Sequence, residues 1–187
     1  MKRFMLLMKM LLFGVFCSSL LVSCKPEAKK EEAVVVPEKK PATELLDPSI
    51  ADPLRKSSDA FSVGDIEGFT ADFADNIRYN WSSGDSLSGK QAVKDYYTSR
   101  WKLIDSVKFN SHIFLPLQVN ESPLKGVMTG KYIMQWSNVS IKYKNGKKIS
   151  FWFHAVNHYN EAGKLDFLSQ YMDRAPIMEA TKGMKVK

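Results

Sequence analysis

The sequence predicts an α+β fold, with helices first along the chain and strands after them. Helix signals gather between residues 47 and 104, where apolar side chains recur at helical spacing behind capping residues. Apolar and polar side chains then alternate over residues 127–143 and 149–159, and Asn145-Gly146 between them is typical of a hairpin turn. Because helices and strands are segregated in this way, we expect helices packed against a mainly antiparallel sheet in one domain, residues 47–187.

The start of the chain is typical of a bacterial lipoprotein signal. Basic residues accompany an apolar run over residues 10–21, which is too short to span a bilayer. The run ends in Leu21-Val22-Ser23-Cys24, a sequence of the lipobox type, in which the chain is cut before the cysteine. We therefore expect residues 1–23 to be a removable signal peptide.

Cys24 is the expected lipidation site. Several acyl chains on one residue suffice for stable anchoring, so we expect a lipid-anchored protein of the bacterial cell envelope, with the outer membrane favoured. Cys17 is lost with the signal, and the sequence contains two cysteines. The remaining chain therefore has no thiol for a disulfide or for cysteine catalysis.

Residues 24–46 join this anchor to the domain. The stretch is rich in Lys, Glu, Pro and Ala, lacks aromatic side chains and has nearly balanced charge. Such a composition cannot bury enough apolar surface to offset the entropy of ordering, and its prolines favour extended conformations. We predict a lipidated cysteine followed by a disordered tether.

Two helices are expected at the start of the domain. Ser49 or Asp52 can cap the first, which carries Leu54 and other apolar residues on one side. Asp65 is a suitable N-cap for a second helix, whose apolar side runs over residues 66–74.

A short strand over residues 77–81 and a loop are expected next. Ser88 can cap a third helix that continues to Ile104. Aromatic residues, including Tyr97 and Trp101, recur on it at helical spacing.

Strands are expected to fill the rest of the domain. The β-branched and aromatic segments are residues 107–119, 127–143, 149–159 and 164–172. Their connections are short, which favours antiparallel neighbours.

Several short motifs occur in a characteristic order and spacing: residues 64–68, 73–76, 88–93, 157–159 and 163–165. Through them the domain resembles the NTF2-like superfamily, and within it the SnoaL-like and ketosteroid-isomerase-type domains. The resemblance implies a cone-shaped barrel, in which three N-terminal helices pack in a curved sheet around one deep pocket. It identifies no chemistry by itself, because this fold carries many functions.

The resemblance also says where catalytic groups would stand in the steroid-isomerase branch. The place of the general base falls on Asn80, and the two oxyanion-binding places fall near Ser57 and on Asn157. An amide cannot accept a proton as a carboxylate does. The sequence therefore argues against steroid isomerisation and predicts no catalytic residue.

Alternation along the late strands, together with the resemblance, predicts which side chains line the pocket. They are aromatic or apolar residues with a few amides. The predicted ligand-binding residues are Tyr79, Asn80, Tyr97, Trp101, Phe153, Asn157, Tyr159, Leu168, Gln170 and Met172.

The opposite face of the sheet is expected to be unusually apolar, since Trp136, Trp152, Phe167 and Tyr171 point outward. An exposed aromatic patch usually marks an interface. A homodimer through this outer face is the simplest interpretation, and a partner protein of the envelope or packing against the C-terminal segment are the alternatives.

Three histidines are candidates for acid–base chemistry. His154 and His158 lie about 13 Å apart along one strand face, which is too far to bind one metal ion directly. Both are expected to be structural or interface residues, as is His112. A pair of His154 with Asp173 remains an alternative.

The sequence favours a binding protein over an enzyme. It contains no P-loop, dinucleotide-binding glycine motif or clustered metal ligands, so no cofactor or metal is expected. The charge of +7 includes three cations in the signal and is dispersed, so nucleic acid is not an expected partner. The expected ligand is small and apolar or amphipathic. The alternatives are a SnoaL-like isomerase, cyclase or dehydratase with relocated acid–base residues, and a protein-interaction module of the envelope.

Overall fold

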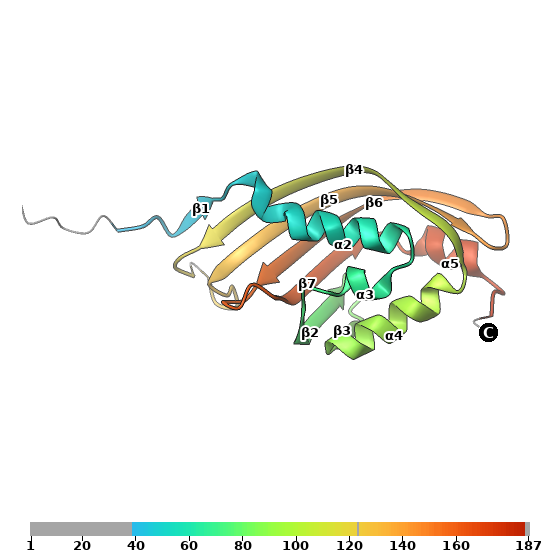
Figure 1. The fold of residues 1–187 in the computed structure, drawn as a ribbon, viewed down its shortest axis with the longest axis horizontal. Coiled ribbons are helices and arrows are strands. Elements are labelled where there is room, and N and C mark those ends of the chain that lie inside the picture. Colours follow the sequence, from blue (N-terminus) through green and yellow to red (C-terminus); the bar gives the residue numbers. More distant parts are fainter. Residues whose placement is uncertain (1–38, 123, 186–187) are drawn as a thin grey trace, which may run out of the picture. The chain divides into compact units, whose positions relative to one another are not determined.

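Seven strands form one curved sheet in the computed structural model, which describes residues 39–122 and 124–185 (Figure 1). The strand order is β1-β4-β5-β6-β7-β2-β3. All neighbours are antiparallel except β2 and β7, which run parallel. The predicted signal peptide, Cys24 and most of the predicted tether lie outside the described residues.

The long strands lie where the sequence predicts them, within a few residues. They are β4 (Ile104–Val119), β5 (Gly130–Tyr143), β6 (Lys148–Tyr159) and β7 (Leu165–Met172). The turn at Asn145-Gly146 joins β5 to β6, with Gly146 at a φ of 86°. The predicted mixed α+β architecture with a strongly curved, mainly antiparallel sheet is confirmed.

Two short strands extend this sheet beyond the prediction. β1 (Thr43–Leu45) pairs with β4, although these residues fall in the predicted tether. Asn120 fixes the same segment, because its side chain donates to the Pro41 carbonyl and to Glu44. The ordered domain therefore begins before residue 47. β3 (Ser86–Ser88) pairs with β2 inside the predicted loop.

The three predicted N-terminal helices are present as α2 (Asp52–Ser62), α3 (Ile66–Phe69) and α4 (Lys90–Trp101). Asp65 caps α3 as predicted, accepting from the Gly68 amide at 2.9 Å. The other predicted caps are wrong. Asp47 caps a preceding 3-10 helix η1 (Pro48–Ala51) that runs directly into α2, and Gly89 begins α4.

The second helix ends earlier than predicted because its apolar residues serve a strand instead. Phe73 and Ala74 open β2 (Phe73–Trp81), where both are buried. The alternation of a short apolar run is compatible with either structure, and pairing with β7 decides for the strand here.

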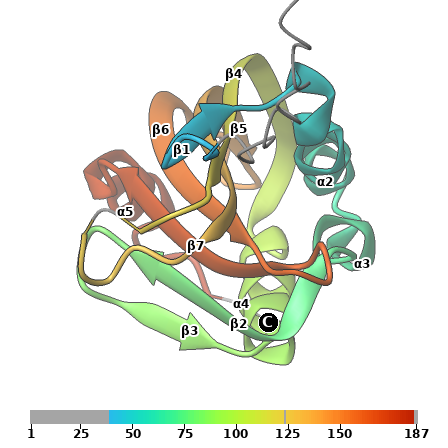
Figure 2. The same cartoon turned by 90° about the vertical axis from the view of Figure 1, so that its left-hand side faces the viewer.

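Strict alternation divides β5 between two environments. Ile133, Gln135, Ser137 and every second residue through Tyr143 are buried on the inner face, and the residues between them lie on the outer face. In β4 the register shifts around Asn110, and this bulge bends the strand. The sheet thus curves around its inner face, with α2, α3 and α4 along the open side (Figure 2).

A further helix, α5 (Ala175–Thr181), was not predicted from the sequence. It packs beside the β5–β6 hairpin, where the Asn145 side chain donates to the Ala180 carbonyl at 2.8 Å. Ala180 is buried with Leu103, Tyr143 and neighbouring apolar residues. Of the helices described between residues 39 and 185, none is both long enough and apolar enough to cross a bilayer.

Candidate functional site: an aromatic pocket inside the curved sheet

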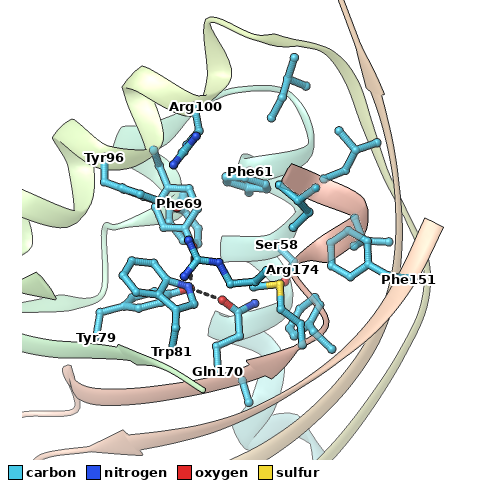
Figure 3. Close-up of a pocket in the computed structure, with 18 of the residues that line it drawn as sticks. Ser58, Phe61, Phe69, Tyr79, Trp81, Tyr96, Arg100, Phe151, Gln170 and Arg174 are labelled. Atoms are coloured by element: carbon cyan, nitrogen blue, oxygen red, sulfur yellow. Dashed lines mark hydrogen bonds between the residues drawn. The ribbon is translucent and has the colours of Figure 1, made fainter. Parts of the chain in front are cut away.

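A pocket of about 190 Å³ lies between the helices and the inner face of the sheet (Figure 3). It separates two buried apolar clusters, one around Tyr79, Trp81 and Leu168 and the other around Val139 and Tyr143. An engineered apolar cavity of roughly 150 Å³ is large enough to bind benzene. The pocket can therefore hold a ligand with one ring or a short aliphatic body.

Aromatic side chains from seven elements, α2, α3, α4, β2, β4, β5 and β6, form the walls. Phe61 of α2 contacts Phe69 of α3 at a ring distance of 5.0 Å and Tyr97 of α4 at 5.3 Å. Across the pocket, Phe151 and Phe153 of β6 close the wall. Most ring pairs around Phe61 are tilted or edge-to-face, which is the arrangement that aromatic quadrupoles favour.

One hydrogen-bonded chain crosses the base of the pocket. The Tyr79 hydroxyl donates to Gln170 Oε1 at 2.7 Å and lies 2.6 Å from the Tyr97 hydroxyl. Since the Tyr79 proton is engaged by Gln170, Tyr97 donates to Tyr79. Burial raises the pKa of both hydroxyls well above the ordinary tyrosine value, so both stay neutral.

Two guanidinium groups also line the pocket. Arg100 extends from α4 over the ring of Tyr96, with 5.0 Å between the guanidinium carbon and the ring centroid (Figure 3). Arg174, which follows β7, lies 5.8 Å from the ring centroid of Trp81. Its Nη1 donates to Asp85 at 2.6 Å and to Ser83 at 2.7 Å, so its charge is partly balanced.

Gln135 connects the pocket to a partly buried histidine. Its Nε2 donates to Ser137 Oγ at 3.0 Å, and Ser137 Oγ lies 2.8 Å from His112 Nδ1. Burial, followed by the nearby Arg55 charge, lowers the pKa of His112. His112 itself does not line the pocket.

Six of the ten predicted pocket residues line this cavity. They are Tyr79, Tyr97, Phe153, Leu168, Gln170 and Met172. The other four, Asn80, Trp101, Asn157 and Tyr159, do not line it.

Each of these four residues is displaced for a local reason. Asn80 lies between the inward-facing Tyr79 and Trp81, so it faces the other side of β2. Asn157 faces inward as predicted, but it is fully buried beyond the pocket wall. Its Nδ2 donates to the Ile133 carbonyl at 3.0 Å. Tyr159 is also buried in the core. Trp101 packs against Phe61 and under Gly64 instead of reaching the cavity.

Several lining residues were missed by the sequence analysis. Gln135 and Val139 could have been found, because alternation over β5 is unbroken. Arg100 also lies at helical spacing from Tyr97 and Tyr96. Arg174 lies after the last predicted strand and outside any periodic pattern, so only the fold brings it to the pocket.

The other two histidines have structural surroundings. His158 is buried, with Nδ1 at 2.5 Å from Asp166 Oδ1 and Nε2 at 2.9 Å from the Thr129 carbonyl oxygen. His154 stacks between Trp136 and Tyr171. Asp173 accepts from the Ala175 amide at the start of α5, which places it in a helix-capping role. Among residues 39–122 and 124–185, no three His, Cys, Asp or Glu side chains form a metal-binding group.

The outer sheet face carries a row of paired side chains, one aliphatic and three with aromatic rings. Ile113, Trp136, His154 and Tyr171 are register partners on β4, β5, β6 and β7. Trp152 beside this row is 54% exposed and Tyr171 is 49% exposed. A network of Asn and Ser side chains borders the patch toward the hairpin. We call this patch the outer aromatic face.

No family model matches the chain, and no curated protein matches it. Solved structures do. An NTF2-like protein of unknown function from Burkholderia pseudomallei shares 16% identity at a TM-score of 0.53, covering 73% of this chain and 100% of that one. A proposed polyketide cyclase from Pseudomonas putida shares 14% at a TM-score of 0.56, over 70% and 96% of the two chains.

A third similar structure is a hypothetical protein with a ketosteroid isomerase-like fold from Catenulispora acidiphila. It shares 9% identity at a TM-score of 0.52, over 72% of this chain and 93% of that one. At such identities the likeness concerns the fold alone. The domain therefore has the NTF2-like fold, as the sequence motifs predict.

Proposed function

We propose that the pocket binds a small apolar or amphipathic molecule without transforming it. The observation that carries this proposal is the composition of the wall. Aromatic and aliphatic side chains surround a few amide, hydroxyl and guanidinium groups, and no Asp, Glu, His or Lys is among the lining residues described. Apolar pockets with a small number of placed polar groups are typical ligand sites.

The same composition disfavours a relocated catalytic site. A general base must accept a proton near neutral pH within hydrogen-bond reach of the ligand. The neutral Tyr79 and Tyr97 and the permanently charged guanidinium groups do not meet this requirement. His112 does not line the pocket and is connected to it by hydrogen bonds through Ser137 and Gln135. An isomerase, cyclase or dehydratase is therefore the weaker alternative.

The location we propose for this binding protein is the bacterial envelope. The lipobox ending at Cys24 supports it, and residues 25–42 supply a spacer before β1 begins at Thr43. Metabolic labelling with radioactive palmitate tests the anchor. We expect the label on the wild-type protein and none on Cys24→Ser, and label retained by Cys24→Ser would contradict it.

We also propose that a second copy of the chain covers the outer aromatic face. The half-exposed Tyr171 within an in-register row of mainly aromatic side chains, the half-exposed Trp152 beside that row and the polar border support an interface. A partner protein of the envelope is the alternative occupant, and it would leave the purified protein monomeric.

The binding proposal is tested by blocking the cavity from inside. Ala155 is 2% exposed, lines the pocket and precedes Val156, which lies on the outer face. In a thermal-shift screen of small apolar compounds, the wild type should be stabilised by some of them and Ala155→Phe by none. Val156→Phe is the matched control on the other face and should respond like the wild type. A screen in which Ala155→Phe responds as strongly as the wild type would remove the pocket from consideration.

A further inference from the structure

Several polar groups left free in the pocket can donate a hydrogen bond, and Gln170 is one of them. The Tyr79 and Tyr97 protons are engaged in the chain that ends at Gln170 Oε1. The Gln170 Nε2 group makes none of the hydrogen bonds found among the described residues, and Figure 3 shows the Gln170 amide turned toward the cavity. Gln135 already donates to Ser137. A ligand that pairs with the free donors must bring acceptors.

The charges of the wall have one sign. Arg100 and Arg174 line the pocket, and no carboxylate lines it. Arg174 is paired with Asp85, whereas Arg100 makes no ion pair or hydrogen bond to any residue in the described parts of the chain. The ring of Tyr96 supports the Arg100 guanidinium from beneath, which limits its freedom before a ligand arrives. Arg100 is thus a positive charge that is held in place by an aromatic ring and has no anionic partner among the described residues.

The apolar part of the ligand is defined by the rest of the cavity. Phe61, Phe69 and Trp81 line a space of about 190 Å³, which accepts one ring or an aliphatic body of similar size. An anionic group cannot enter this apolar space unpaired, because desolvation of an isolated charge is very unfavourable. It would instead stay beside Arg100, which is itself exposed to solvent.

We propose that the ligand is a small amphipathic anion, such as an aryl- or alkyl-carboxylate. Its apolar body lies among Phe61, Phe69 and Trp81, and its carboxylate accepts from the Arg100 guanidinium. Arg174 adds a second positive charge and Gln170 Nε2 a neutral donor. This inference rests on the proposed binding function and specifies its ligand class.

Isothermal titration calorimetry of the purified full-length protein at pH 7 tests it with two probes of nearly equal shape. They are 3-phenylpropionate, which is anionic, and 3-phenylpropionamide, which is neutral. We expect the anion to bind about tenfold more tightly, the usual size of a charge-assisted hydrogen bond. Arg100→Gln should reduce this ratio to near one, because it weakens binding of the anion more than binding of the amide.

Lys102→Gln is the matched control, because it removes the same charge from the exposed residue that follows α4 and does not line the pocket. It should keep the tenfold preference. Equal affinity of the wild type for both probes, or a preference that survives in Arg100→Gln, would overturn the anion inference while leaving ligand binding intact. Failure of both probes and of every neutral apolar compound would count against the binding function itself.

Discussion

Both faces of the curved sheet carry aromatic side chains, but several on the inner face are buried and two on the outer face are half exposed. On the inner face, Tyr79 is 2% exposed and its hydroxyl bridges Tyr97 and Gln170. On the outer face, Tyr171 is 49% exposed and stacks on His154. The inner aromatics surround a hollow with free donors, whereas the outer aromatics form an uninterrupted row. This difference underlies our two proposals, a small-molecule site on the inner face and an interface on the outer face.

The largest difference between the faces is expected from truncating neighbours in β5. Ile133 is 1% exposed on the inner face, and Met134 follows it on the outer face. Ile133→Ala should lower the free energy of unfolding by about 2–5 kcal/mol, because it leaves a cavity in the core. Met134→Ala should lower it by less than about 1 kcal/mol. Urea denaturation checks both, and equal losses would contradict the assignment of faces.

Removing one hydroxyl from each face should give a smaller contrast. Tyr79→Phe leaves Gln170 Oε1 and the Tyr97 hydroxyl without their partner and should destabilise the protein by about 1–3 kcal/mol. Tyr171→Phe keeps the stacked ring and should change stability by less than about 0.5 kcal/mol. Thermal unfolding of the two variants measures the difference. If Tyr79→Phe left stability unchanged, the buried hydrogen-bonded chain would not be what stabilises the base of the pocket.

Alkaline pH should act on the inner face first. Burial raises the pKa of Tyr79 and of Tyr97, so the folded protein retains protons that the unfolded chain loses above about pH 10. Stability is therefore full below pH 10 and falls as pH rises further, by at most about 1.4 kcal/mol per pH unit for each group. Denaturation curves between pH 9 and 11.5 measure the slope. It should be shallower in Tyr79→Phe, and an identical slope would contradict the expected coupling.

Substitution of Trp152 should have the smallest effect on stability. Its effect on dimer assembly should be large. Trp152→Lys should change the free energy of unfolding of the single chain by less than about 0.5 kcal/mol, because this ring is half exposed. It should nevertheless shift the protein from dimer to monomer in analytical ultracentrifugation. Ser150→Lys, two residues away in the polar border, is the control and should stay dimeric. A monomeric wild type would favour a different partner for the outer aromatic face.

The sequence predicts the fold well because its strongest signals are periodic. Alternation over β6 places Phe153 on the pocket side, and the resemblance places Leu168, Gln170 and Met172 of β7 there, where all four line the cavity. The elements it misses are short. The three residues of β1 and the seven of α5 have little local preference, and both form through contacts with distant strands.

The site is harder to predict than the fold because it depends on depth and on register. Tyr79 and Asn80 are both predicted to line the pocket, but neighbouring residues of a strand face opposite sides, and only Tyr79 faces the cavity. Asn157 points inward but lies one row too deep. Arg174 lies in the connection after the last strand, where no periodic pattern predicts that its side chain lines the pocket.

The central claim, a binding pocket on the inner face, is tested most directly by nuclear magnetic resonance. Side-chain amide and indole resonances of ¹⁵N-labelled protein would be followed during titration with 3-phenylpropionate. We predict that the resonances of Gln170 Nε2 and Trp81 Nε1 shift and saturate together, and that the resonance of the exposed Trp152 indole does not shift. The ligand spectrum should show no product. Shifts confined to Trp152, or chemical conversion of the ligand, would contradict the account.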